Sequence, residues 1–111
     1  MQYINFTPHE IMVPSHGWRL VISDWVARCD EDADPLESTS PVPLFHARYG
    51  EVHLVDRHGT RTPFPEPEPN TIFIVPALVH AVMAERKDVF RPYGPVFDSK
   101  DRMIGYAGLA R

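Results

Sequence analysis

The stretch that decides the fold is Asn70-Thr-Ile-Phe-Ile-Val-Pro-Ala-Leu-Val-His-Ala-Val-Met-Ala84. Within it, 72–75 is an unbroken run of β-branched and aromatic residues, which is typical of a buried strand. Pro76 suits the first position of a helix, where its missing N–H leaves no hydrogen bond unmade. The next apolar residues recur at helical spacing and predict a helix over 77–85 with one buried face. That face consists of Leu78, Val79, Val82 and Met83.

Shorter apolar segments on both sides of this unit predict a sheet around it. We expect strands at 3–6, 11–13, 18–22 and 25–29, and a hairpin at 96–106 whose turn carries residues 98–102. Residues 44–55 fit either a tight hairpin around Gly50 or one bent strand with a bulge there. Twelve prolines argue against long helices. The sequence therefore predicts a compact α+β fold, mainly antiparallel β-sheet with one short helix.

Length and composition indicate the broad class of protein. The 111 residues make a single domain, 1–111, in which the acidic, Pro- and Ser-rich segment 30–43 is expected to be a mobile loop. A net charge of −4 argues against a nucleic-acid binder. No apolar run approaches the roughly 20 residues of a membrane span. A single cysteine, Cys29, fits a reducing compartment, so we expect a cytoplasmic protein without a membrane partner.

Polar residues at the edges of the apolar segments are the best candidates for a site. Arg86, Asp88 and Arg91 follow the helix, while Arg28 and Asp98 stand at the ends of expected strands. Because each lies at an edge, we expect Arg28, Arg86 and Asp98 to converge. Arginines could hold a phosphate while an aspartate accepts hydrogen bonds from a ribose or base. An internal network of arginines and carboxylates that ties the last hairpin to the core is an equally good interpretation.

Two further segments carry candidate ligand contacts. His9, after Thr7 and Pro8, is either a ligand-contacting imidazole or part of a turn held by the side chains of Asn5 and Thr7, and the turn is favoured. Tyr49 could stack on a base, although aromatic residues more often lie in a core. The predicted ligand-binding residues are Asn5, His9, Arg28, Tyr49, Arg86, Asp88, Arg91 and Asp98.

Motifs for catalysis are missing from the sequence. It has no Walker pattern, no Gly-x-Gly-x-x-Gly and no Gly-x-Ser-x-Gly. His46 and His53 could start a metal site with Glu51, but histidines at helical spacing and paired cysteines are both lacking. Cys29 is expected to pack as a small apolar residue. We therefore expect no catalytic residue, no metal and no cofactor.

Short motifs in a fixed order give the chain a family resemblance. They are Asn5-Phe6-Thr7-Pro8-His9, Val26-Ala27-Arg28, Tyr49-Gly50-Glu51-Val52, Thr71-Ile72-Phe73-Ile74-Val75 with Ala77-Leu78-Val79, Arg86 with Asp88-Val89 and Pro92, and Asp98 with Ile104-Gly105. With them the chain resembles a family of small tailed-phage and prophage proteins that opens with Asn-Leu-Thr-Pro-His. Pro76 stands where that family usually has Ser. The resemblance is weakest over 30–43, and it implies a phage accessory protein without transferring an activity.

These observations favour a binding module over an enzyme. The ligand would be a small anionic or nucleotide-like signal, or the partner a host protein, and capturing either could counter a host defence. The alternatives are a small nucleotide-directed hydrolase, with His9 or Asp98 as acid or base, and a minor virion or assembly component. Because short strands leave exposed edges around a small core, we also expect a homo-oligomer.

Overall fold

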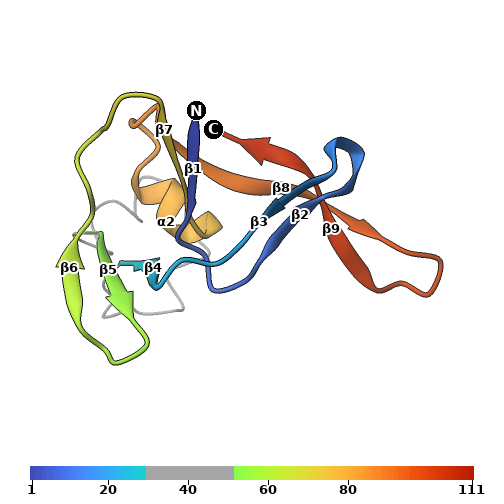
Figure 1. Ribbon diagram of the computed structural model, residues 1–111, viewed down its shortest axis with the longest axis horizontal. Helices are drawn as coiled ribbons and strands as arrows, with labels where there is room; N and C mark the ends of the chain where they lie inside the picture. Colours follow the sequence, from blue (N-terminus) through green and yellow to red (C-terminus); the bar gives the residue numbers. More distant parts are fainter. Residues whose placement is uncertain (30–51) are drawn as a thin grey trace.

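The computed structural model describes residues 1–29 and 52–111, and the arrangement of its elements is shown in Figure 1. The expected acidic loop at 30–43, the segment around Gly50 and the candidate Tyr49 lie outside the described residues. The described part is mainly β-structure with one short helix. This agrees with the fold class expected from the sequence.

The centre of the fold is β7 (Thr71–Ile74), the strand expected from its apolar run. It lies between β1 (Gln2–Asn5) and β8 (Val89–Phe97), and both pairings are parallel. β8 continues into β9 (Met103–Ala110) through the predicted turn, so the sheet order is β1-β7-β8-β9. Four of the six strand pairings in the described part are antiparallel, but the central strand is held by the two parallel ones.

Two smaller antiparallel units pack beside this sheet. The first pairs β2 (Ile11–Val13) with β3 (Trp18–Leu20) around the 3-10 turn η1 (Pro14–His16). Gly17 closes that turn in the left-handed conformation, with φ of 65°, which glycine adopts without steric cost. The second contains β4 (Trp25–Arg28), β5 (His53–Asp56) and β6 (Arg61–Pro63) in that order.

The helix α2 (Ala77–Val82) crosses from β7 to the parallel β8, as a parallel pairing requires. It is shorter than the expected 77–85, and Pro76 is its N-cap rather than its first helical residue. Val79 is buried, as expected, and Val82 packs half-buried against the core. The expectation for Leu78 is wrong, because its side chain is 40% exposed. A helix of six residues presents fewer positions to the core than a longer helix does.

The buried residues form two clusters on opposite sides of β7. The helix-side core contains Phe6, Ala27, Cys29, Leu54, Phe73, Val75, Val79 and Val89. The second cluster lies on the side of the β8–β9 hairpin, and we call it the arm-side core. It contains Ile11, Val13 and Ile74, with Tyr106 and Leu109 of β9 packed against it. Successive side chains of a strand point to opposite faces. Phe73 and Val75 therefore pack into one cluster while Ile74 packs into the other. β7 thus lies between the two clusters and contributes side chains to both.

Candidate functional site

The Asn5 to His9 segment is a turn whose buried polar groups satisfy one another. The Asn5 side-chain amide donates to the carbonyl oxygens of His9 (3.0 Å) and Leu20 (3.1 Å). Its oxygen Oδ1 accepts from the backbone N–H of Thr7 (2.9 Å) and from the Thr7 hydroxyl (2.6 Å). Asn5 is 3% exposed, so these bonds leave its side chain little access to a ligand, whereas His9 is exposed. The contacts support the turn that the sequence favoured.

Arg86 and Asp88, both predicted as site residues, lie together as an internal ion pair. The guanidinium binds both carboxylate oxygens, with Nε to Oδ1 at 2.9 Å and Nη2 to Oδ2 at 2.5 Å. Arg86 Nη1 also donates to the carbonyl oxygen of Pro65 at 2.8 Å. The guanidinium carbon lies 5.2 Å from the ring centroid of Phe64 and 5.9 Å from that of Phe73. These contacts are internal, as in the second interpretation of the sequence, but they tie Arg86 to Asp88 and Pro65 rather than the last hairpin to the core, and they use the donors that a ligand would need.

The other predicted polar residues have separate surroundings. Asp98 Oδ1 accepts from the backbone N–H groups of Arg102 and Lys100. These bonds, and one from the Arg102 side chain, hold the pKa of the Asp98 carboxyl below its usual value. Arg91 lies 5.9 Å from the centroid of the Tyr93 ring on β8. The β8–β9 turn and the strands β4 and β5 lie at opposite ends of the molecule (Figure 1). The structure therefore does not bring Arg28, Arg86 and Asp98 together.

Arg28 instead lines a pocket at the edge of the β4–β5–β6 sheet, which we call the β4–β5 pocket. Its volume is about 660 Å³. The lining comes from the segment that leads into β4, from β4 itself, from the end of β5 and from the turn that follows β5. The lining residues are Ile22, Ser23, Asp24, Trp25, Val26, Arg28, Val55, Asp56, Arg57 and His58.

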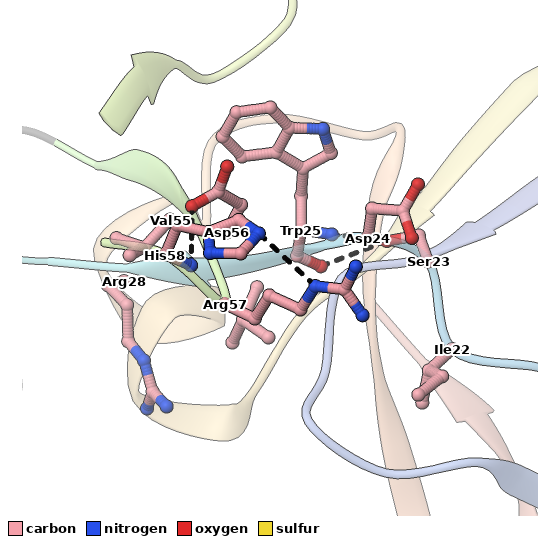
Figure 2. A pocket seen from close by; sticks show the side chains of 10 residues that line it. Ile22, Ser23, Asp24, Trp25, Arg28, Val55, Asp56, Arg57 and His58 are labelled. Atoms are coloured by element: carbon pink, nitrogen blue, oxygen red, sulfur yellow. Dashed lines mark hydrogen bonds between the residues drawn. The ribbon is translucent and has the colours of Figure 1, made fainter. Parts of the chain in front are cut away.

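The register of β4 and β5 sorts these side chains by face. Trp25 is paired with Asp56, and Val26 with Val55. Trp25 packs against the helix-side core, so the opposite face, with Val26 and Val55, is turned outward. Figure 2 shows Trp25 pointing to one side of β4, and Arg28 and Arg57 to the other. The outward side of the pocket thus combines two half-buried valines with two guanidinium groups.

Charge distinguishes these two arginines from three others in the chain. Arg19, Arg86 and Arg102 each form an ion pair with a carboxylate. Within residues 1–29 and 52–111, neither Arg28 nor Arg57 is paired with one. The contact found for Arg57 is a 3.4 Å hydrogen bond from Nε to Nε2 of His58. Both guanidinium groups therefore keep N–H donors available to an anion.

The two aspartates of the pocket differ in what they can still bind. Asp56 Oδ1 accepts from the backbone N–H groups of His58 and Thr60, both at 2.9 Å, and so fixes the β5–β6 turn. In the described part of the chain, no hydrogen bond or ion pair is found for the Asp24 carboxylate. That carboxylate can accept hydrogen bonds from hydroxyl or amine groups of a ligand.

Sequence reasoning missed Arg57, His58 and Asp24 as site residues. Arg57 and His58 stand within Asp56-x-x-Gly59, a turn signal without chemical meaning of its own. The pocket exists because β5 pairs with β4 across an intervening segment of more than twenty residues, which local spacing does not reveal.

Comparison of the chain with protein-family models, curated proteins and solved structures finds no match. In the described residues no helix is long and apolar enough to cross a membrane. Residues 1–29 and 52–111 also contain no group of three or more His, Cys, Asp or Glu side chains placed to hold a metal ion. The local geometry of the β4–β5 pocket is therefore the basis for a functional assignment.

Proposed function

We propose that this chain is a phage or prophage accessory protein that binds a small anionic, nucleotide-like molecule in the β4–β5 pocket. The observation that carries the proposal is the pair of guanidinium groups, Arg28 and Arg57, which face the outward side of the pocket and have no carboxylate partner among the described residues. Capturing such a molecule in the host cytoplasm would withdraw it from host signalling, which is how a binding module could counter a defence system.

The pocket suits the separate parts of a nucleotide. Arg28 and Arg57 would bind phosphate oxygens, because guanidinium groups match the geometry of phosphate. Val26, Val55 and Ile22 provide apolar surface for the flat face of a base. Asp24 would accept hydrogen bonds from ribose hydroxyl groups.

Binding fits the described residues better than hydrolysis. The hydrolase alternative assigned acid or base roles to His9 and Asp98. His9 is exposed on the Asn5 turn, and Asp98 accepts hydrogen bonds that close the β8–β9 turn. Neither residue lines the β4–β5 pocket.

The proposal is tested by equilibrium dialysis or calorimetry of the purified chain with nucleoside mono-, di- and triphosphates, cyclic dinucleotides and inorganic phosphate. We expect retention of at least one nucleotide, with an affinity that falls as salt rises. Arg28→Gln and Arg57→Gln should each weaken binding about tenfold or more, since a hydrogen bond to a charged group contributes about 1.5–3 kcal/mol.

Arg19→Gln is the matched control. It removes the same charge from an exposed arginine that pairs with Glu10 away from the pocket, and it should leave binding unchanged. Equal weakening by all three variants would mean that overall charge, rather than the pocket, attracts the anion. Absence of retention by the parent protein would refute the small-ligand function and favour a host protein as partner. Turnover of a nucleotide would make the chain an enzyme.

A further inference from the structure

The β8–β9 hairpin projects from the body of the molecule as an arm with two long edges (Figure 1). β8 pairs with β7 through Val89 and Phe90, so its later residues lie beyond that pairing. β9 is the last strand in the sheet order, and no described strand pairs with its far side. Both edges therefore present backbone groups that could pair with another strand.

The two edges of the arm differ in how they are protected. β8 carries Pro92 and Pro95, and proline cannot donate a backbone hydrogen bond to a neighbouring strand. β9, Met-Ile-Gly-Tyr-Ala-Gly-Leu-Ala, has neither a proline nor a charged residue over its eight positions. Natural proteins commonly block exposed edges with prolines and charges. β9 is a long edge that lacks both.

The neighbouring β2–β3 unit covers a face of the arm rather than this edge. A Cβ atom built on Gly105 would lie 2.6 Å from the carbonyl oxygen of Met12 and 2.9 Å from Cδ of Pro14. A Cβ projects from the face of a strand, so β2 crosses the face of β9 at Gly105. Tyr106 and Leu109 also pack toward the arm-side core through their side chains. Within the part of the chain that the structure describes, no strand pairs with the far edge of β9.

Exposed apolar side chains cluster near the tip of the same arm. Phe97 and Met103 are cross-strand partners and are 56% and 53% exposed, and Ile104 beside them is 45% exposed. The charged groups of the intervening turn include the Asp98–Arg102 ion pair, which carries no net charge. An apolar surface next to an open edge is the usual composition of a protein contact.

We propose that β9 pairs antiparallel with β9 of a second copy of this chain, joining two arms into one continuous sheet. A second copy fits this edge because the strand is uncharged and can pair with itself. Each chain carries a net charge of −4, yet a strand with no charged residue meets no like charge when it pairs with itself. Antiparallel pairing of identical strands is also self-complementary, as a two-fold dimer requires. The contact would cover part of the apolar tip.

The test is the mass of the purified chain in solution, measured by light scattering or sedimentation at several concentrations. We expect a dimer for the parent. Ala107 is exposed near the centre of β9, so Ala107→Lys and Ala107→Glu would each place like charges close together across the two-fold axis. Both variants should be monomers with circular dichroism spectra like that of the parent.

Mixing the two variants separates lost pairing from lost folding. Lys and Glu attract one another, so an equimolar mixture should recover the dimer mass, which two misfolded chains would not do. Leu78→Lys is the control, because it adds a charge at an exposed position on α2, and it should remain a dimer. A monomeric parent would overturn the proposal. Dimers that persist in both Ala107 variants would also overturn it, since the interface would then lie elsewhere.

Discussion

Arg86 is the residue with the densest set of polar and aromatic contacts among the predicted site residues. It binds Asp88 twice, donates to Pro65 and lies over two phenylalanine rings. Its side chain is 25% exposed, so solvent weakens the pair but does not remove it. These contacts fix the connection between α2 and β8 onto the segment that contains Phe64.

Replacing Arg86 with alanine should therefore lower stability rather than ligand binding. We expect Arg86→Ala to reduce the free energy of unfolding by about 1–3 kcal/mol, because the Asp88 carboxylate would lose its partner. Urea unfolding measures this change, and nucleotide retention should stay at the parent value. Arg102→Ala removes an exposed arginine from an ion pair and should cost less. If Arg86→Ala lost nucleotide retention but kept the unfolding midpoint of the parent, Arg86 would belong to the ligand site.

Asp88 makes the same ion pair sensitive to pH. Hydrogen bonds from Arg86 hold the pKa of the Asp88 carboxyl below its ordinary value, against a smaller opposing effect of burial. The unfolded chain then binds the proton more readily than the folded chain. The stabilisation is fully present above the ordinary aspartate pKa of about 3.9 and is lost as pH falls through the folded value.

Unfolding midpoints measured between about pH 3 and pH 6 test this linkage. The parent should lose stability steeply toward the acid end, and Asp88→Asn should show a shallower slope there because its amide does not titrate. Asp98, whose pKa is also lowered, supplies part of the remaining slope. Identical slopes for the parent and Asp88→Asn would show that the pair contributes nothing to the pH dependence.

Asn5 has a structural role that the sequence motif alone could not establish. Its side chain joins the end of β1 to the following turn and to the end of β3. Asn5→Ala would leave the Thr7 backbone N–H without its acceptor, while the Thr7 hydroxyl keeps the His9 carbonyl oxygen, so we expect a loss of about 1–3 kcal/mol in the free energy of unfolding. Asn5→Asp keeps the acceptor oxygen for Thr7 but removes the amide donor. If Asn5→Ala is as stable as the parent, ligand contact becomes the better account of this residue.

At the scale of elements, α2 shows why one helical position matters and its neighbour does not. Val79 is 3% exposed in the helix-side core, whereas the adjacent Leu78 is 40% exposed. Val79→Asp would bury a charge without a partner and should unfold the domain. Leu78→Asp changes the same helix at an exposed position and should melt close to the parent. Thermal melts of both variants test this difference between the two positions. Equal melting temperatures would mean that Val79 does not face the core as described.

The elements that sequence could predict are those with strong local patterns. β7 follows from its apolar run, the β8–β9 turn from its polar residues, and the start of α2 from the position of Pro76. The short strand β6 was not expected, because Pro63 and the prolines after it argue for a linker. β6 forms as an edge strand beside β5, a place where the sheet tolerates a proline.

The candidate site was harder to predict because it depends on long-range pairing. Arg28 was expected at a site, but Arg57 and His58 were not, since they belong to a turn far along the chain. The parallel pairing of β1 with β7 likewise joins residues about seventy positions apart. Local patterns contain no information about which distant segments meet. By contrast, the contact between Arg86 and Asp88 joins residues two positions apart.

At the scale of the whole molecule, β7 couples the two hydrophobic clusters. Phe73 and Val75 pack into the helix-side core while Ile74, between them, packs into the arm-side core. Losing either cluster would expose one face of the same four-residue strand. We therefore expect the described units to unfold together in one cooperative transition.

The two tryptophans report on the two sides of the molecule. Trp25 packs against the helix-side core, and Trp18 is the cross-strand partner of Val13, a residue of the arm-side core. Trp18→Phe and Trp25→Phe each leave one fluorescent tryptophan. Urea unfolding of each variant, followed by its fluorescence and by circular dichroism of the backbone, should give coincident midpoints within that variant. A fluorescence transition that precedes the backbone transition would show that its cluster melts separately and that β7 does not couple the two cores.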